Sequence, residues 1–368
     1  MTNKEKEIYE ALRVNPSLSQ NELAKKLNIT RSSASVHISN LIKKGYVRGR
    51  GYILNEPGYV TVIGAANYDI VGRSAAPLIA EDSNPGSIQV CAGGVGRNIA
   101  ENLARIGVSV KLISALGDDI SGNKVSEIST AAGVDMNHCY IKPNGHTSTY
   151  MAILENSGEM NVAMSDMGIL NEMPLEHIGK KQMIISNSEL IVLDANLTQT
   201  MLEYILANFT DCRLFIDPVS VSKAHHIKRH MGAFDTIKAN RFEAEVLTEV
   251  SISDDGSLRQ AGEVFLQKGV RQVFISLGSR GLYYRTADEE NFLSTIPICP
   301  VNATGAGDAL MAGVVFAALR ELSCREAAEI GNAMSRIALM SELTVSPLMS
   351  MDNVKYEMTQ AKYNLDCK

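Results

Sequence analysis

Asn302-Ala303-Thr304-Gly305-Ala306-Gly307-Asp308 is the stretch that decides how the rest of the chain is interpreted. The apolar run before it, residues 296–301, predicts a strand. The run after it, residues 309–319, is long, apolar and rich in alanine, which predicts a buried helix. A glycine-rich turn entering a helix leaves several backbone N–H groups unpaired at one point, and the helix dipole adds positive potential there. The stretch therefore predicts an anion site that a phosphate can approach closely.

Asp308 gives this turn a chemical role. A carboxylate beside an anion site repels a resting phosphate, so we expect Asp308 to accept a proton from a hydroxyl group that attacks the phosphate. The backbone of Gly305, Ala306 and Gly307 would then stabilise the charge on the transferring group. The alternative is a capped helix whose carboxylate only satisfies backbone amides. The turn taken alone does not choose between the two.

Two signatures resemble those of the PfkB, or ribokinase-like, family of sugar and nucleoside kinases. Gly305-Ala306-Gly307-Asp308 resembles the catalytic signature, and Gly93-Gly94-Val95-Gly96-Arg97-Asn98-Ile99-Ala100 resembles the N-terminal one. Two long signatures in the right order are far more specific than one glycine-rich loop. The resemblance implies ATP-dependent phosphoryl transfer with Asp308 as the general base. It also implies an α/β fold, with a doubly wound central sheet and a small β lid.

Composition and charge are consistent with a cytoplasmic enzyme of two parts. The chain has 368 residues, of which 45% are hydrophobic, enough for one large or two ordinary domains. The charged first residues lack the apolar core of a secretory signal, no apolar run is long enough to span a bilayer, and the six cysteines form no C-x-x-C pair. Residues 1–57 hold ten Lys/Arg against five Asp/Glu, a surplus of five positive charges, while the whole chain carries −6 and residues 58–368 therefore carry −11. This asymmetry predicts two functions.

Residues 1–57 are expected to form a small DNA-binding domain. Ser19-Gln20-Asn21-Glu22 matches a capping box, and three helical segments precede two short strands within residues 46–54. This pattern resembles a winged helix-turn-helix module, which implies that the third helix enters the major groove with Arg31, Ser32 and Ser33. Arg48 and Arg50 in the wing would contact phosphates. A relic, or a contact surface for the larger domain, is the alternative.

Residues 58–368 are expected to form the kinase domain, with lid segments at roughly 70–92 and 140–165. The strand-like runs at residues 59–64, 190–194, 214–218 and 272–276 predict buried parallel strands, and the alternating runs at 147–154 and 159–164 predict a hairpin of the lid. Ligands should gather beyond the carboxyl ends of the parallel strands. By analogy with the family we also expect a homodimer.

The resemblance implies a set of substrate-binding residues near the first signature. Asn67 and Asp69 follow the first strand of the domain and would bind sugar hydroxyls, a role that suits a double acceptor. Gly93 and Gly94 would let the backbone approach the substrate, and Asn98 would contact a hydroxyl group. An Asx-turn is the alternative for Asn67 and Asp69. Arg97 stands where many relatives have alanine, and could contact a phosphate or lie in solvent.

The resemblance also implies where ATP and its metal bind. Asn240-x-x-Glu243 resembles the motif that organises Mg²⁺ and its waters, although a helix cap is the alternative reading of these two residues. Asn302 replaces an aspartate that helps relatives bind a monovalent cation, so K⁺ dependence is left open. The remaining nucleotide-binding residues would be Ser276, Gly278, Ser279, Gly281, Thr304 and Asn332.

Several segments resemble bacterial pseudouridine kinases within this family. They include Asp82-Ser83-Asn84-Pro85-Gly86, Asp217-Pro218-Val219-Ser220 and Asn240-Arg241-Phe242-Glu243-Ala244-Glu245. The resemblance covers roughly residues 60–346 and implies phosphorylation of the 5′-hydroxyl of pseudouridine. Because a few side chains can retune a pocket, another nucleoside (inosine, guanosine or cytidine) or a free pentose stays open. A transcription regulator whose kinase-like domain only senses a nucleoside is a further alternative.

Overall fold

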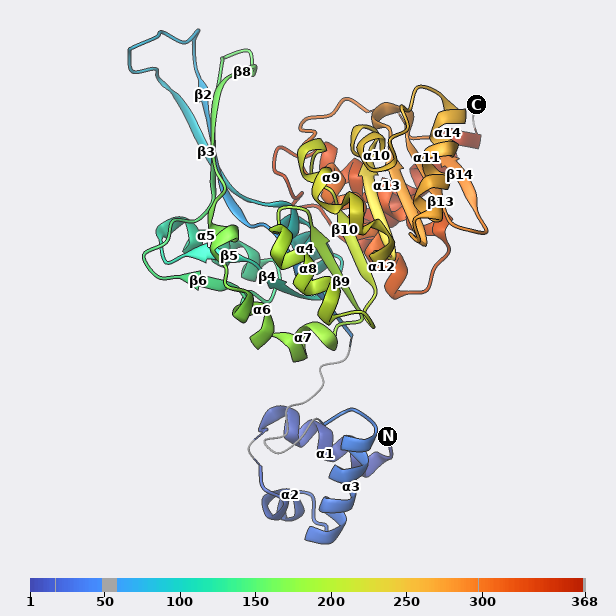
Figure 1. Ribbon diagram of the computed structural model, residues 1–368. Coiled ribbons are helices and arrows are strands. Elements are labelled where there is room, and N and C mark those ends of the chain that lie inside the picture. The colour runs from blue at the N-terminus through green and yellow to red at the C-terminus, as the bar shows by residue number, and fades with distance from the viewer. Residues whose placement is uncertain (17, 48–57, 297, 367–368) are drawn as a thin grey trace. The chain divides into compact units, whose positions relative to one another are not determined.

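The chain divides into two compact units, Met1–Gly58 and Tyr59–Lys368. The computed structural model describes residues 1–16, 18–47, 58–296 and 298–366 (Figure 1).

The first unit is a small bundle of three helices, α1 (Asn3–Val14), α2 (Gln20–Lys26) and α3 (Arg31–Lys43). A hydroxyl side chain caps each helix, because Thr2, Ser19 and Thr30 accept hydrogen bonds from backbone N–H groups of the first turns. The predicted capping box is confirmed, since Ser19 and Glu22 bond to each other's backbone. The buried side chains that hold the bundle together are Ile8, Leu12, Leu23, Ile38 and Leu41.

The second unit is built on an eight-stranded sheet with the order β14-β13-β12-β11-β10-β9-β1-β4. The six strands from β12 to β4 are parallel, and β13 and β14 add an antiparallel edge. The strands predicted at 59–64, 190–194, 214–218 and 272–276 are confirmed as β1, β9, β10 and β12. The strands are β1 (Tyr59–Ile63), β4 (Ser109–Ile113), β9 (Leu190–Asp194), β10 (Leu214–Asp217), β11 (Thr236–Asn240), β12 (Gln272–Ser276), β13 (Leu282–Arg285) and β14 (Glu290–Leu293).

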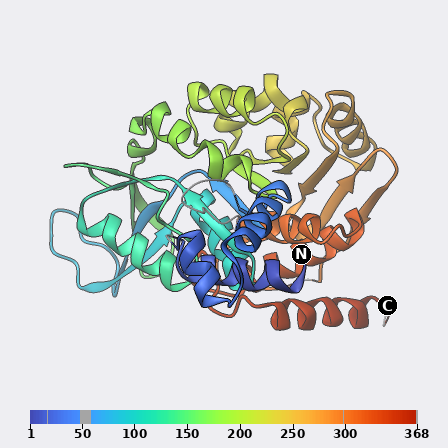
Figure 2. The same cartoon turned by 90° about the horizontal axis from the view of Figure 1, so that it is seen from below.

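Helices cover both faces of this sheet, which confirms the doubly wound α/β class (Figure 2). Side chains of one strand alternate between the two cores: Val60 and Val62 of β1 pack in one, and Ile63 in the other. On the first face lie α4 (Val95–Arg105), α5 (Ile120–Ala131), α12 (Ala306–Leu319), α13 (Cys324–Leu339) and α14 (Met351–Asp366). On the second lie α6 (Leu175–Lys180), α7 (Gln182–Ser186), α8 (Gln199–Asn208), α9 (Val221–Ile227), α10 (Arg241–Thr248) and α11 (Asp255–Gln267).

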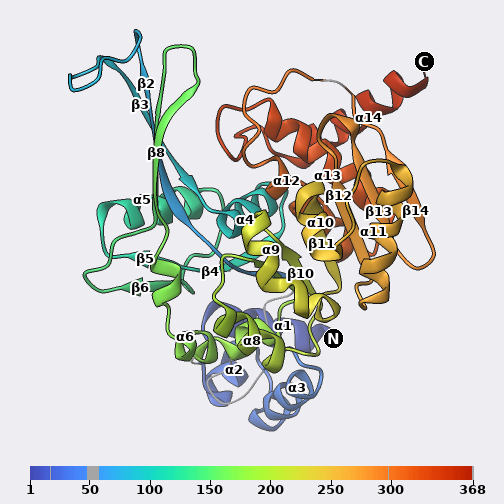
Figure 3. The same cartoon turned by 45° about the horizontal axis from the view of Figure 1, so that its top comes forward.

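The predicted buried helix after the glycine-rich turn is confirmed as α12, whose residues from Asp308 to Ala317 are all buried. It packs beside α4 and α13 on the first face (Figure 3). The strand predicted at 296–301 is wrong. Residues 296 and 298–301 form no strand, and the Val301 N–H donates to the Leu339 carbonyl at the end of α13 (2.8 Å) instead of joining the sheet. Among the described residues, no helix is both long and apolar enough to cross a membrane.

A separate four-stranded sheet, β3-β2-β7-β8, forms the lid and projects from the body of the unit (Figure 1). Its strands are β2 (Asn67–Ser74), β3 (Gly86–Gly93), β7 (Thr149–Leu154) and β8 (Met160–Asp166). The predicted hairpin is confirmed by the antiparallel pairing of β7 with β8. Residues 140–142 differ from the expected lid segment, because β6 (Tyr140–Lys142) pairs with β5 (Ala115–Gly117) in a sheet of its own.

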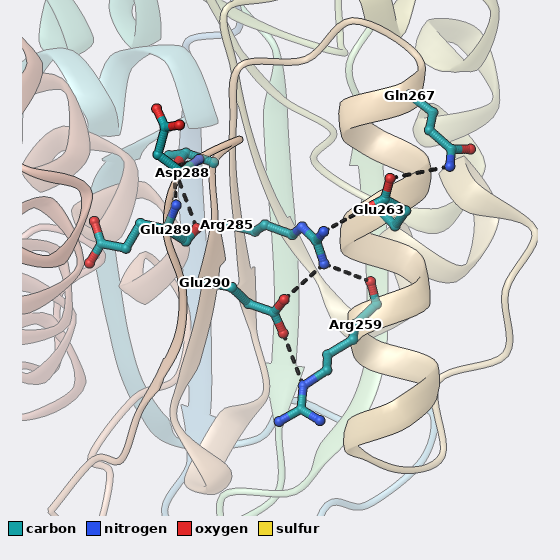
Figure 4. A network of polar contacts seen from close by, with 8 residues as sticks. Arg259, Glu263, Gln267, Arg285, Asp288, Glu289 and Glu290 are labelled. Atoms are coloured by element: carbon teal, nitrogen blue, oxygen red, sulfur yellow. Dashed lines mark hydrogen bonds and ion pairs between the residues drawn. The ribbon is translucent and has the colours of Figure 1, made fainter.

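The antiparallel edge is tied to α11 by a network of charged side chains (Figure 4). Arg285 of β13 bonds both Glu263 of α11 and Glu290 of β14, and Arg259 of α11 donates to the same Glu290 carboxylate (3.0 Å). Arg280, in the loop before β13, pairs with Asp255 at the start of α11 (2.8 Å). These contacts anchor the loop between β12 and β13, which the sequence assigns to the nucleotide site.

Candidate active site

The glycine-rich turn is shaped by Gly305, which precedes α12 with a left-handed backbone (φ 86°). A Cβ atom at this position would lie 1.9 Å from the carbonyl oxygen of Thr344, so only glycine fits. No side chain of the described residues caps α12 at Gly305. The first-turn amides of α12 are therefore available to an anion, as the sequence predicts.

Asp308 lies buried in the first turn of α12, where Asn98 Nδ2 donates a hydrogen bond to its Oδ2 atom (2.8 Å). Burial and the nearby carboxylates of Asp217 and Asp194 raise the pKa of Asp308 to about 7, against the opposing effects of Lys238 and Asn98. A carboxylate with a pKa near neutrality can accept a proton and release it again under ordinary conditions. Asp308 thus has the properties of a general base.

A buried ion pair lies next to this turn, between Lys238 of β11 and Asp217 of β10 (Nζ–Oδ2, 2.7 Å). A Cβ on Gly307 would lie 2.6 Å from Lys238 Nζ, which places the ammonium group directly against the anion turn. Burial alone would lower the pKa of Lys238, but Asp217, Glu243 and Asp308 raise it above its ordinary value. Lys238 therefore remains a cation. Neither residue was predicted as a site residue, although both stand at or near the carboxyl ends of strands.

A cavity of about 580 Å³ opens beside Asp308, and it has a charged end and an apolar end. Asp217, Lys238, Glu243 and Asp308 line the charged end. Ile296, Ile298, Pro300 and Leu339 line the apolar end, together with Arg336, whose guanidinium donates to the Ile296 carbonyl (2.9 Å). The segment wrongly predicted as a strand therefore forms part of the cavity wall. The structure brings to this one cavity the predicted residues Asn240, Glu243, Ser276, Gly278, Ser279, Gly281, Ala306, Gly307, Asp308 and Asn332.

Asn240 and Glu243 form a reciprocal cap at the start of α10. The Asn240 N–H donates to Glu243 Oε2 (2.8 Å), and the Glu243 N–H donates to Asn240 Oδ1 (3.0 Å). The helix-cap interpretation therefore describes their local structure. Burial and Asp217 raise the pKa of Glu243, whereas Lys238 and Asn240 oppose that rise. Burial disfavours the ionised form of Glu243, and a bound cation would favour it, so this carboxylate is a suitable metal ligand. Its role in binding magnesium stays a prediction.

Of the predicted sugar-binding residues, Asn67, Asp69 and Gly93 lie on β2 and β3 of the lid sheet, whereas Gly94 precedes α4 and Asn98 lies in its first turn. Asn67 pairs with Gly93 across the strands, and its side-chain amide donates to Asp69. A Cβ on Gly93 would lie 2.2 Å from Asp69 Oδ2, so this carboxylate presses against bare backbone. Burial raises the pKa of Asp69 to about 6, while the charge of Arg97 and the Asn67 bond act in the opposite direction. None of these residues lines the cavity beside Asp308.

Three of the residues predicted for the catalytic turn, the nucleotide or a cation do not line the cavity. Asn302 and Thr304 are exposed or partly exposed before α12, where Asn302 Oδ1 accepts the Thr304 N–H (2.9 Å) and Nδ2 donates to the Glu342 carbonyl (3.1 Å). Gly305 shapes the turn without lining the cavity. The Asn302 side chain is thus engaged in local bonds, and a role in binding K⁺ stays a prediction.

Asp194 of β9 and Arg97 of α4 are buried charged residues next to the site. Asp194, fully buried at the end of β9, accepts hydrogen bonds from the N–H groups of Ala65 and Gly96 (both 2.8 Å). It thereby fixes the start of α4 against the loop after β1. The expectation that Arg97 could lie in solvent is wrong, because this side chain is 1% exposed and pairs with Glu101 one turn along α4. Asp194 carried no recognisable motif in the sequence.

In the first unit, Arg31 and Ser32 are exposed in the first turn of α3, and the Ser33 N–H donates to Thr30 Oγ1 (3.1 Å). The helix face predicted to meet DNA is therefore accessible within this unit. Arg48, Arg50 and most of the predicted wing lie outside the described residues.

Comparison with protein families gives a match for each unit. Residues 58–350 match the pfkB family of carbohydrate kinases, and residues 1–48 match a winged helix-turn-helix DNA-binding family. The first match spans the sheet, the lid strands and every residue of the cavity, and the second spans α1 to α3.

Individual relatives agree with the family match. The chain is 36% identical to the uncharacterised sugar kinase YeiI of Escherichia coli K12, over 96% of this chain and 98% of YeiI. It is also 36% identical to the pseudouridine kinase of the same organism, over 82% of this chain and 96% of the relative. A carbohydrate kinase from Agrobacterium tumefaciens is 28% identical with a TM-score of 0.73, over 82% of this chain and 97% of that structure.

Replacing Gly305 with alanine should distort the start of α12, and Gly107→Ala is the matched control. Both glycines have φ 86°, so both substitutions carry the left-handed penalty of about 1–2 kcal/mol. No described atom lies within 4 Å of a Cβ at Gly107, whereas Gly305→Ala also collides with the Thr344 carbonyl. We expect the urea unfolding midpoint to fall further for Gly305→Ala than for Gly107→Ala. Nucleotide binding should be weakened by Gly305→Ala only. Equal effects of the two substitutions would contradict this account of the turn.

Proposed function

Because the chain belongs to the pfkB family of carbohydrate kinases, phosphotransferases with an alcohol group as acceptor, we propose that it phosphorylates the 5′-hydroxyl of a nucleoside with ATP and that this nucleoside is pseudouridine. The observation that carries the proposal is the buried Asp308 carboxylate, which lies at the anion turn, opens onto the cavity and is bonded to Asn98 of the other signature. We place the reaction in the cytoplasm, where ATP is available.

In the proposed reaction, the 5′-oxygen of the nucleoside attacks the γ-phosphorus of ATP, and the bond from that phosphorus to the β–γ bridging oxygen breaks. The hydroxyl proton passes to Asp308, and ADP leaves. The backbone of Gly305 to Gly307 and the Lys238 ammonium stabilise the charge of the transferring group, because both lie at the anion turn. Asp217 holds Lys238 in place.

The charged end of the cavity fits a divalent cation. Three carboxylates, Asp217, Glu243 and Asp308, line the cavity against two cations, Lys238 and Arg336. Arg336 is already paired with Glu357, so a triphosphate would meet a surplus of negative charge. Glu243, through water, and Asn240 would hold Mg²⁺, which neutralises charge on the phosphates when it is bound. The apolar end, with Asn332 beside it, suits the flat, apolar faces of adenine.

Support for a substrate that contains ribose comes from the lid side of the site. Asp69 and Asn67 provide adjacent acceptors and a donor for two neighbouring hydroxyl groups of ribose. Support for pseudouridine comes from the relative of that activity, which is 36% identical over nearly its whole length. YeiI is as similar to this chain as the pseudouridine kinase is, and it covers more of the chain, but its name gives no specific substrate. Inosine, guanosine, cytidine and a pentose therefore remain the substrates to compare with pseudouridine.

The first unit favours an additional role in DNA binding. Its residues match a winged helix-turn-helix family, and Arg31 and Ser32 are exposed at the start of α3. We propose that the chain is an active kinase with a DNA-binding unit attached. A regulator that only senses a nucleoside would have no need for a general base at Asp308.

Asp308→Asn should remove phosphoryl transfer while leaving nucleotide binding intact. The amide cannot accept the hydroxyl proton, so kcat should fall by about 10²–10⁴-fold. Wild-type kcat/KM should fall tenfold per unit of pH below about 7, because protonation of Asp308 removes the base. The exposed Asp352→Asn on α14 serves as control and should match the wild type. Turnover retained by Asp308→Asn in the ADP-release assay would rule out this base.

Arg31→Ala should weaken binding to DNA from upstream of the chain's own gene. If Arg31 contacts a phosphate, its loss should lower affinity and reduce the slope of log K against log salt by about one. Arg13→Ala is the control, because Arg13 is also exposed but lies on α1, paired with Glu10. Fluorescence anisotropy at several KCl concentrations measures both. Absence of salt-sensitive binding by the wild type at low ionic strength would refute DNA binding.

A further inference from the structure

Arg97, in the first turn of α4, is a charged residue whose side chain is buried. Its side chain is 1% exposed, and that of its partner Glu101 is 4% exposed. A buried guanidinium is costly unless its N–H groups find partners. One terminal nitrogen pairs with the Glu101 carboxylate, and the other donates to Asn98 Oδ1 (2.5 Å). Arg97 thus joins a buried carboxylate to a side chain that contacts Asp308.

The bond from Arg97 decides which end of the Asn98 amide faces Asp308. An amide has one acceptor end and one donor end, and a guanidinium can only donate. Because Arg97 takes Oδ1, the donor nitrogen must point the other way, where it bonds Asp308 Oδ2 (2.8 Å). If the Asn98 amide were rotated by half a turn, its Oδ1 atom would face the Asp308 carboxylate. Two acceptors would then be in contact without a hydrogen bond between them.

We propose that Arg97 is a positioning residue for the phosphoryl transfer, which fixes the Asn98 amide and thereby holds the Asp308 carboxylate in the orientation needed to accept the hydroxyl proton. The inference rests on the proposed kinase function. The chain of contacts runs from Glu101 through Arg97 and Asn98 to Asp308, and every bond along it is buried.

The backbone around Arg97 is fixed as well. The Arg97 N–H donates to the Ala65 carbonyl (3.0 Å), and Asp194 accepts the N–H groups of both Ala65 and Gly96. The first turn of α4 therefore cannot shift easily. The side chain of Arg97 acts from a rigid base, as positioning of a reacting group to a fraction of an ångström requires.

The groups that face Asp308 make its protonation sensitive to Asn98. The carboxylates of Asp217 and Asp194 favour the protonated acid, whereas the Lys238 cation and the Asn98 donor favour the carboxylate. Losing the donor, or turning the amide oxygen toward Asp308, removes one of the two opposing groups. The base would then ionise at a higher pH than in the wild type.

Arg105 provides a matched control within the same helix. It also pairs with Glu101, through Oε1 (2.7 Å), but lies about two turns beyond Asn98 and is partly exposed. Arg105→Met removes a cation from the same carboxylate and leaves the bond from Arg97 to Asn98 in place. Only Arg97→Met breaks the chain of contacts that ends at Asp308.

The test compares the two variants with the wild type by ADP release, with Mg-ATP and the nucleoside that the wild type phosphorylates, from pH 5.5 to 9. We expect kcat of Arg97→Met to fall by about 100-fold, with the acidic limb of its pH profile moved upward by about one unit. Because the Arg97 charge also lowers the pKa of Asp69, Asn98→Ala, which keeps that charge, should move the limb upward as well. Arg105→Met should stay within about twofold of the wild type, with an unmoved limb. In an Asn98→Ala background, Arg97→Met should have little further effect on kcat, because the side chain that it positions is gone.

Two results would overturn the inference. The first is an Arg97→Met variant that matches Arg105→Met in kcat and pH profile. The second is an effect of Arg97→Met that is undiminished in the Asn98→Ala background. If Arg97→Met does not fold, Arg97→Lys decides in its place, since it keeps the charge but loses the fork that reaches both Glu101 and Asn98. It should show the same upward shift, and an unmoved limb would overturn the inference. A wild type without turnover would overturn the proposed function and this inference with it, whereas the other results leave the proposed function standing.

Discussion

The hydrogen bond from Asn98 to Asp308 is the contact on which the site depends. It joins two residues 210 positions apart in sequence, each in the first turn of a helix on the same face of the sheet. The two helices must start beside each other for this bond to form. Asp194 fixes one start by holding Gly96, and the close approach of Gly305 to Thr344 fixes the other. The fold as a whole serves to bring these two helix starts together at the edge of the parallel strands.

Burial then gives the side chains at this edge their chemistry. Asp194, Asp217 and Asp308 are all buried within one region, and Lys238 is the cation that lies among them. Burial disfavours the charged form of each carboxylate and the neighbouring carboxylates add to this effect, so the pKa of Asp194 rises to about 6 and that of Asp308 to about 7. A carboxylate that exchanges a proton near neutrality beside an anion turn is suited to deprotonating an alcohol. The same surplus of negative charge creates a place for a cation when a triphosphate enters.

The sequence predicted those parts of the molecule that local rules determine. The capping box at Ser19, the helix after Asp308 and the parallel strands follow from capping chemistry and apolar periodicity, which act within a few residues. The prediction of a strand at 296–301 was wrong because apolar side chains of this segment line a cavity and do not belong to a sheet. The pattern of apolar residues does not distinguish a cavity wall from a strand. Lys238, Asp217 and Asp194 were missed because their partners are distant in sequence. For the same reason the solvent alternative for Arg97 was wrong, because a charged residue in a helix indicates solvent unless its buried partners are known.

The central claim is that the Asp308 site phosphorylates a nucleoside, and the coupled ADP-release assay tests it most directly. Purified full-length protein with Mg-ATP would be offered pseudouridine, inosine, guanosine, cytidine and ribose in parallel. The account predicts turnover with a marked preference for pseudouridine, and the product should carry the phosphate on its 5′-oxygen. A preference for another nucleoside or for ribose would contradict the proposed substrate but retain the mechanism. Tight nucleoside binding without ADP release on any member of the panel would contradict the claim that this chain is a kinase.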